Sequence, residues 1–154
     1  TWQIEIPSFL DEQGVEKPAQ NPPGDIDFTH AGFAARFKGD RFYYSYDRCH
    51  TWEGPFRLPD FGRSALLART DYIVNDRNTL TAFIATDKDG GDEGWPCCIR
   101  TEDGGATWRH IGWIGQQPPA GYGYSIMPAT IPLGEHGYLS MIRRAGVIDG
   151  KKGW

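Results

Sequence analysis

The sequence predicts an all-β protein, and two observations carry this prediction. Among its 154 residues are seven Tyr, eight Phe, six Trp, 20 Gly and 11 Pro. Aromatic residues favour strands, and Gly and Pro favour the turns between them, so many short strands are expected rather than helices. Similar turns also recur along the chain: Asp47 and Asp103 lie 56 positions apart, from 47 to 103. This recurrence indicates that one strand-rich unit is repeated.

The N-terminal part of the chain is expected to hold an irregular stretch followed by a first strand-rich unit. Residues 1–29 contain a Pro-rich and Gly-rich loop, and only residues 2–6 alternate as a strand does. A tight turn at Lys38-Gly39-Asp40 predicts a hairpin. Strands are expected at residues 32–37, 41–46 and 56–58.

The next unit is longer, and a third one follows it. In the second unit, an acidic, Gly-rich loop at residues 87–94 separates two strands. In the second unit, strands are expected at residues 69–74, 80–85, 95–100 and 110–114. In the third unit, strands are expected at residues 127–133 and 138–144. Aligning Leu139 with Leu80 places Trp154 on Trp95, so the third strand of this unit is expected to begin at Trp154.

Four-stranded units that recur every 50–60 residues are typical of β-propeller blades. We expect blades at residues 30–62 and 63–116, and an incomplete blade at residues 117–154. About two and a half blades are thus predicted, whereas a closed propeller needs about four to eight. The chain is therefore expected to be a segment that packs against the remaining blades of a longer protein.

Two turns carry the same residue pattern. Residues 101–108 read Thr-Glu-Asp-Gly-Gly-Ala-Thr-Trp, and residues 45–52 repeat the Ser/Thr, Asp, Thr and Trp but place Cys49 where Gly is expected. Asp and Gly suit a chain reversal, because Asp accepts hydrogen bonds from nearby amides and Gly permits positive φ. Thr107 can close the turn, and Trp108 can anchor it in apolar surroundings.

These turns resemble the Asp-boxes of the sialidase (neuraminidase) superfamily. The resemblance implies a sialidase-like β-propeller, six-bladed when complete, and a secreted or periplasmic location. It also implies that the boxes are structural turns on the outer rim, so that Asp47 and Asp103 are not catalysts. Candidate site residues must therefore come from other positions.

The resemblance assigns candidate residues in the second unit. Arg69 occupies nearly the place of the arginine that holds the substrate carboxylate in sialidases. The stretch with Arg57 resembles that motif by its letters, but it follows a box and is interpreted as a fourth strand. Asp92 or Asp89, in the loop before the strand that leads to the box, can take the place of the catalytic acid/base. A solvated acidic loop is the alternative interpretation.

In the third unit, Arg144 falls at the position of a second carboxylate-binding arginine. Because side chains alternate along a strand, only one of Arg143 and Arg144 can face inward, and the alignment favours Arg144. His30, just before a strand, can also face the propeller axis. Met127 stands where sialidases have the glutamate that activates their tyrosine nucleophile, and a thioether cannot accept a proton.

The resemblance therefore predicts a carbohydrate-active enzyme that is not a standard sialidase. Exo-glycosidase-type hydrolysis of a glycan with an acidic sugar is the first hypothesis. A polysaccharide lyase acting on uronate-containing glycans and a non-catalytic glycan-binding propeller are the alternatives. Met127 favours both alternatives over a true sialidase.

Composition and residue spacing bear on nucleic acid, membranes, metals and disulfides as further partners or features. A net charge of −4 does not suggest nucleic acid, and no segment approaches the roughly 20 apolar residues of a membrane span. Neither a calcium-loop nor a zinc spacing is present, so no metal or cofactor is expected. Three cysteines are expected as buried free thiols, with a disulfide of Cys49 as the alternative.

Overall fold

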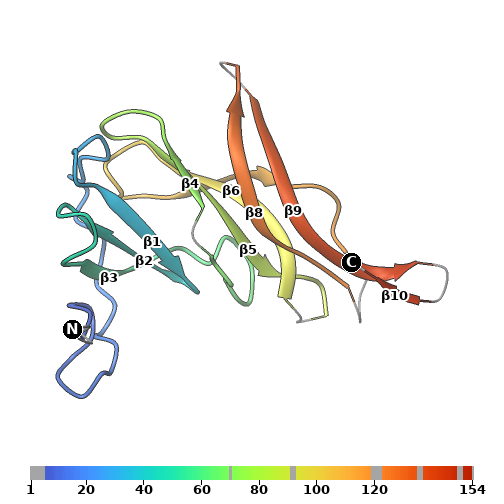
Figure 1. The fold of residues 1–154 in the computed structure, drawn as a ribbon, viewed down its shortest axis with the longest axis horizontal. Coiled ribbons are helices and arrows are strands. Elements are labelled where there is room, and N and C mark those ends of the chain that lie inside the picture. Colours follow the sequence, from blue (N-terminus) through green and yellow to red (C-terminus); the bar gives the residue numbers. More distant parts are fainter. Residues whose placement is uncertain are drawn as a thin grey trace, which may run out of the picture.

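In a computed structural model of the chain, residues 6–69, 71–90, 93–118, 123–134, 137–148 and 151–153 are described. They form ten β-strands and no helix, which confirms the all-β prediction. The strands make three antiparallel sheets that follow one another in chain order (Figure 1). The described residues contain no helix long and apolar enough to cross a membrane.

The first sheet has the order β1-β2-β3. Its strands are β1 (Ala34–Lys38), β2 (Arg41–Ser45) and β3 (Glu53–Arg57). Lys38 pairs with Arg41, so the predicted hairpin at Gly39 and Asp40 is confirmed. On the free side of β3, Gln20 forms backbone hydrogen bonds with Pro55 (2.8 Å) and Arg57 (3.0 Å). Only Ile6 of the strand expected at residues 2–6 lies within the described residues.

The second sheet has four strands in the order β4-β5-β6-β7, as the sequence predicts for this unit. They are β4 (Tyr72–Val74), β5 (Leu80–Asp87), β6 (Glu93–Thr101) and β7 (Arg109–Trp113). β4 is shorter than expected and does not include Arg69. Leu67 instead donates its amide to Ala85 at 2.8 Å, so the chain pairs with the far end of β5 before β4 begins.

The third sheet has the order β10-β9-β8. Its strands are β8 (Tyr124–Leu133), β9 (Gly137–Ile148) and β10 (Lys151–Gly153). The expectation that a third strand begins at Trp154 is wrong, because Gly153 already pairs with Gly146 in β9. β9 extends beyond the predicted residue 144, and the chain has therefore returned along it before residue 154.

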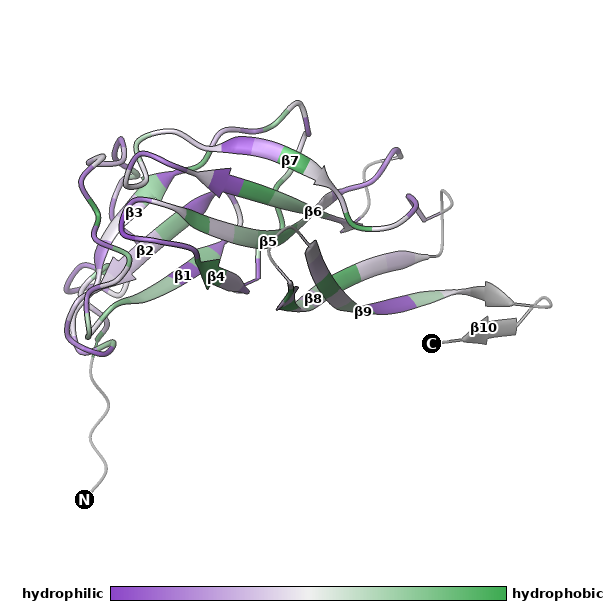
Figure 2. Cartoon of the chain, turned by 90° about the horizontal axis from the view of Figure 1, so that it is seen from above, coloured by the Kyte–Doolittle hydropathy of each residue, from purple (hydrophilic) through white to green (hydrophobic). Residues whose placement is uncertain are grey.

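The two central strands of the second sheet, β5 and β6, are largely buried on both faces. One face shares a core with the first sheet, and its members include Phe37, Phe42, Ala82, Ile84 and Trp108. On the other face, the ring of Phe83 packs edge-on against Tyr138 of β9, with ring centroids 5.3 Å apart. Figure 2 shows apolar residues along β5 and β6, between the first sheet and β8. Every residue of β5 is buried, which explains its continuous rather than alternating apolar pattern.

The three cysteines are free, so no disulfide of Cys49 forms. Cys97 and Cys98 are buried in β6, and burial raises the pKa of Cys97 to about 12 and that of Cys98 to about 11. The expectation of a buried thiol holds for these two but is wrong for Cys49, which is exposed. Cys49 lies in the turn between β2 and β3.

Candidate functional site

The turns and loops that connect the strands lie at the two opposite ends of the strands, which we call the box edge and the loop edge. The box edge comprises residues 24–33, 45–52, 75–79 and 101–108, and it is joined by backbone hydrogen bonds from Gly104 to Asn78 (3.0 Å) and from Ile26 to Gly104 (3.1 Å). The loop edge comprises residues 38–41, 58–69, 88–90 and 114–118. Leu58 donates its amide to Asp40 at 2.8 Å across this second edge.

The turn at residues 101–108 is closed by its own side chains. Asp103 accepts hydrogen bonds from the Thr107 amide (2.9 Å), the Thr107 hydroxyl (2.6 Å) and the Thr101 hydroxyl (2.8 Å). Trp108 is 6% exposed and packs against Phe37 and Phe42. The predictions that Thr107 closes this turn and that Trp108 anchors it are confirmed. The carboxylate of Asp103 is occupied within the turn, which gives it a structural role.

The turn at residues 45–52 has the same hydrogen bonds. Asp47 accepts from the Thr51 amide (2.8 Å), the Thr51 hydroxyl (2.7 Å) and the Ser45 hydroxyl (2.8 Å). Arg48 and Cys49 adopt φ values of 60° and 72°, although neither is glycine. The corresponding glycines in the other turn have φ values of 66° and 92°. Two non-glycine residues are thus held in the left-handed region.

We predict that Cys49→Gly stabilises the protein by about 1 kcal/mol, because glycine has no Cβ to strain the left-handed conformation. The free energy of unfolding, measured by denaturant titration, tests this gain. Gly105→Ala at the corresponding position is the matched control and should destabilise. Its new Cβ would lie 2.9 Å from Ile26 Cδ1, at a φ of 92°. A loss of stability in Cys49→Gly would contradict the prediction.

The same turns predict a loss of stability in acid. Hydrogen bonds from the amide and hydroxyl of Thr51 and from Ser45 lower the pKa of Asp47 to about 2. Burial raises the pKa of Asp103, but the hydrogen bonds from Thr107 and Thr101 outweigh it, and the pKa is lowered. Because the folded pKa lies below the ordinary value of 3.8, this stabilisation is present above about pH 4 and is lost as pH falls towards 2.

Asp47→Asn should therefore flatten the pH dependence of unfolding between about pH 4 and pH 2. Free energies of unfolding of the unmodified protein and the variant, measured across this interval, provide the comparison. Two curves that fall in parallel would show that Asp47 does not carry this pH dependence.

The loop edge holds a cluster centred on Arg63, which the sequence did not indicate. The Arg63 side chain is 14% exposed and donates to Asp87 Oδ1 (3.2 Å), the Asp87 carbonyl (2.9 Å) and Asp89 Oδ1 (3.3 Å). Its guanidinium carbon lies 5.8 Å from the ring centroids of Trp95 and Trp113, which stack on one another. Cation–π attraction adds to these hydrogen bonds.

Asp87 fastens the segment that carries Arg63. Its carboxylate accepts hydrogen bonds from the Ser64 hydroxyl (2.5 Å) and the Ala65 amide (3.3 Å). Burial raises the pKa of Asp87, but these hydrogen bonds and the charge of Arg63 outweigh it, and the pKa is lowered. Asp87 is therefore an anion at neutral pH and holds the loop rather than supplying a proton.

The structure brings two of the predicted site residues to the loop edge. Arg69 is half exposed and donates from one terminal nitrogen to Glu93 at 3.2 Å. Asp89 has a 76% exposed side chain and is paired with Arg63. Asp92, the other predicted acid, lies outside the described residues.

The remaining predicted residues lie elsewhere. Arg143 and Arg144 are exposed on β9, opposite Ile126 and Ser125 of β8. The guanidinium of Arg143 lies 5.6 Å from the ring centroid of Tyr124. His30 lies on the box edge, where its Nδ1 accepts a hydrogen bond from the Gly32 amide at 3.1 Å. The structure thus places His30 at the opposite edge from Arg69 and Asp89.

Met127 lies in an irregular part of β8. The register with β9 shifts between Ile126 and Ala129, and Met127 adopts a φ of 52°. Its side chain is exposed. A bulge that holds a non-glycine residue in the left-handed region redirects a side chain at some energetic cost, and such strain is concentrated at functional sites.

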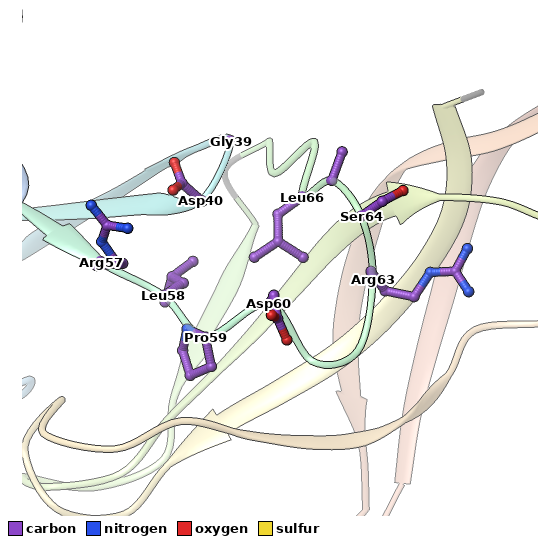
Figure 3. Close-up of a pocket in the computed structure, with 10 residues that line it drawn as sticks. Gly39, Asp40, Arg57, Leu58, Pro59, Asp60, Arg63, Ser64 and Leu66 are labelled. Carbon is purple, nitrogen blue, oxygen red and sulfur yellow. The ribbon is translucent and has the colours of Figure 1, made fainter. Parts of the chain in front are cut away.

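A pocket of about 570 Å³ opens on the loop edge, between the turn after β1 and the segment after β3 (Figure 3). Leu58 and Leu66 form its buried floor. Asp40, Arg57 and Asp60 form its polar rim. No group of three or more His, Cys, Asp or Glu side chains is placed to hold a metal ion in the part of the chain that the structure describes.

In comparisons with known proteins, no family model, no curated protein and no solved structure matches this chain.

Proposed function

We propose that the chain is a segment of a sialidase-like β-propeller and that its loop edge binds a glycan carrying an acidic sugar. Two observations support the architecture. The Asp103 and Asp47 turns share one hydrogen-bond pattern, as repeated blade turns would. Antiparallel sheets also follow one another so that the middle one is covered on both faces, which is how blades stack.

The state of Arg69 carries the functional proposal. Its side chain is 49% exposed, and its partner Glu93 is 35% exposed. A surface ion pair of this kind contributes about 0–1 kcal/mol, so a ligand carboxylate can replace Glu93 at little cost. Arg63, in contrast, is only 14% exposed, lies beside two indoles and is bound by Asp87 and Asp89. Of these two arginines, Arg69 is the one available to a ligand.

The geometry supports binding better than hydrolysis. A glycosidase needs one carboxyl group that is protonated when the substrate is bound. Asp89 Oδ1 accepts a hydrogen bond from a guanidinium nitrogen of Arg63 at 3.3 Å, so this oxygen is already engaged within the protein. Met127 offers no proton acceptor to a nucleophile. Exo-glycosidase-type hydrolysis is the second candidate, and the exposure of Asp89 to an incoming glycan favours it.

Removing the Arg69 side chain tests the proposal. Glucuronic acid and N-acetylneuraminic acid, titrated against the full chain by calorimetry, should bind, and Arg69→Ala should weaken the better ligand at least about tenfold, because a charge-assisted hydrogen-bond pair is lost. Arg77→Ala is the matched control, since Arg77 is exposed and paired with Asp27 at 3.7 Å on the box edge. Equal affinities in both variants, or no binding at all, would contradict the proposal.

Product analysis with an acidic oligosaccharide separates the classes of function. New reducing ends without a double bond would indicate hydrolysis. Ultraviolet absorbance of an unsaturated uronate would indicate a lyase. Binding without either product is the expected result.

A further inference from the structure

We propose that the pocket on the loop edge is a subsite for a neutral sugar unit of the same glycan. This inference rests on the proposed function and names a second part of its ligand. Four features of the pocket carry it: the chemistry of its lining, its charge, its fixed walls and its position beside Arg69.

The lining combines an apolar floor with hydrogen-bonding groups. Asp40 and Arg57 lie side by side at one end of the pocket, Ser64 lies at the other, and Leu58, Leu66 and Asp60 lie between them (Figure 3). The C–H face of a pyranose ring can pack on Pro59 and Ala65, the exposed apolar members of the lining, next to the almost fully buried leucines. Its hydroxyl groups can donate to the carboxylates and accept from the guanidinium.

The charge of the rim suits a neutral ligand. Asp40 and Asp60 bring two negative charges, and Arg57 brings one positive charge. Arg63 contributes its backbone to the wall, but its guanidinium points away from the pocket (Figure 3) and is bound to Asp87 and Asp89. Arg41 pairs with Asp40 at 3.4 Å, so two negative and two positive charges meet at the rim and give an anionic sugar no net attraction, while carboxylates remain good acceptors for hydroxyl groups.

The walls of the pocket are fixed before any ligand binds. Asp60 accepts hydrogen bonds from the Gly62 amide (2.8 Å) and, through its carbonyl, from the Arg63 amide (3.0 Å). Phe61, between Asp60 and Gly62 in the chain, adopts a φ of 54°. Ser64 is bonded to Asp87, which ties the wall to the end of β5. A pre-formed wall spares the ligand the entropic cost of ordering it.

The pocket adjoins the proposed acidic-sugar position. Gly39 on its rim forms a β-bridge with Ala68, the residue directly before Arg69. Its volume of about 570 Å³ lies in the range of about 300–1,000 Å³ that is usual for ligand pockets. An acidic sugar at Arg69 and a neutral sugar in the pocket can therefore be neighbouring units of one glycan.

Methyl-group NMR of the full chain tests this subsite. The probes are the methyl glycosides of glucose, galactose, mannose and N-acetylglucosamine, each titrated to about 50 mM, because single sugars are expected to bind in the millimolar range. At least one should shift the methyl signals of Leu58 and Leu66 in a saturable manner. No shift with any of the four would overturn the subsite.

Substitutions at the rim of the pocket test whether the methyl shifts report binding of the glycoside there. Asp40→Ala and Arg57→Ala should each weaken the bound glycoside at least about fivefold, because each loses a charged hydrogen-bond partner. Arg77→Ala, on the box edge, should leave this affinity unchanged. Unchanged affinity in both rim variants would overturn the assignment.

A parallel titration with glucuronic acid distinguishes the two proposals. Glucuronic acid binding that depends on Arg69, without glycoside binding at Leu58 and Leu66, would overturn the subsite alone. The reverse result would overturn the proposed function alone and leave an isolated neutral-sugar site.

Discussion

Trp108→Ala is expected to lower the free energy of unfolding by about 3–5 kcal/mol, as measured by denaturant titration. Trp108 follows the Asp103 turn directly, and its ring centroid lies 5.8 Å from that of Phe37 and 5.5 Å from that of Phe42. Its removal would open a cavity in the core that the first and second sheets share. The large expected loss follows from the size of the indole and its near-complete burial.

Trp52→Ala is the matched variant in the other turn. Trp52 occupies the corresponding position, but it is only half buried and is not part of that core. Its loss should therefore cost less than half as much stability. If both variants lost the same free energy of unfolding, the prediction that Trp108 anchors its turn in the core more strongly than Trp52 does would be wrong.

Arg63→Ala is the second substitution with a large expected effect, a loss of about 3 kcal/mol in the free energy of unfolding. The Asp87 side chain is 6% exposed, so the variant would leave a buried carboxylate without its cation. Removing one partner of a buried ion pair costs about 3–5 kcal/mol of stability. We expect a value at the lower end of this range, because Ser64 and Ala65 would still donate hydrogen bonds to Asp87.

A double-mutant cycle with Asp87→Ala isolates this interaction. The double variant should be more stable than the sum of the two single effects predicts, because neither charge is then left alone. Strictly additive losses would contradict a direct coupling between Arg63 and Asp87.

The sequence predicted the all-β class and most of the strands, because strands and turns are encoded locally. The turn at Gly39 and the Asp103 turn depend on neighbouring residues, and both were placed correctly. The end of β9 was not, because residues 145–148 continue the strand without a local signal that residue 144 is not its end. β4 was predicted too long because its pairing with β5 depends on where residues 65–68 bind.

The candidate site was predictable only in part. Resemblance to Asp-box proteins indicated Arg69 and Asp89, and both lie on the loop edge. It did not indicate Arg63, whose bond to Asp87 joins residues 24 positions apart and depends on how segment 58–69 folds back on β5. The pocket beside Arg69 likewise arises from two turns brought together by the Gly39–Ala68 bridge.

Amide NMR of the full chain during titration with glucuronic acid decides whether the loop edge binds an acidic sugar. The largest shifts are expected at the Arg69 side chain and at the amides of Ala68 and Glu93. The turns around Asp47 and Asp103 should not shift, because their carboxylates are already occupied by Thr51 and Thr107. Shifts centred on these two turns, with none at Arg69, would contradict the separation of a structural box edge from a ligand-binding loop edge.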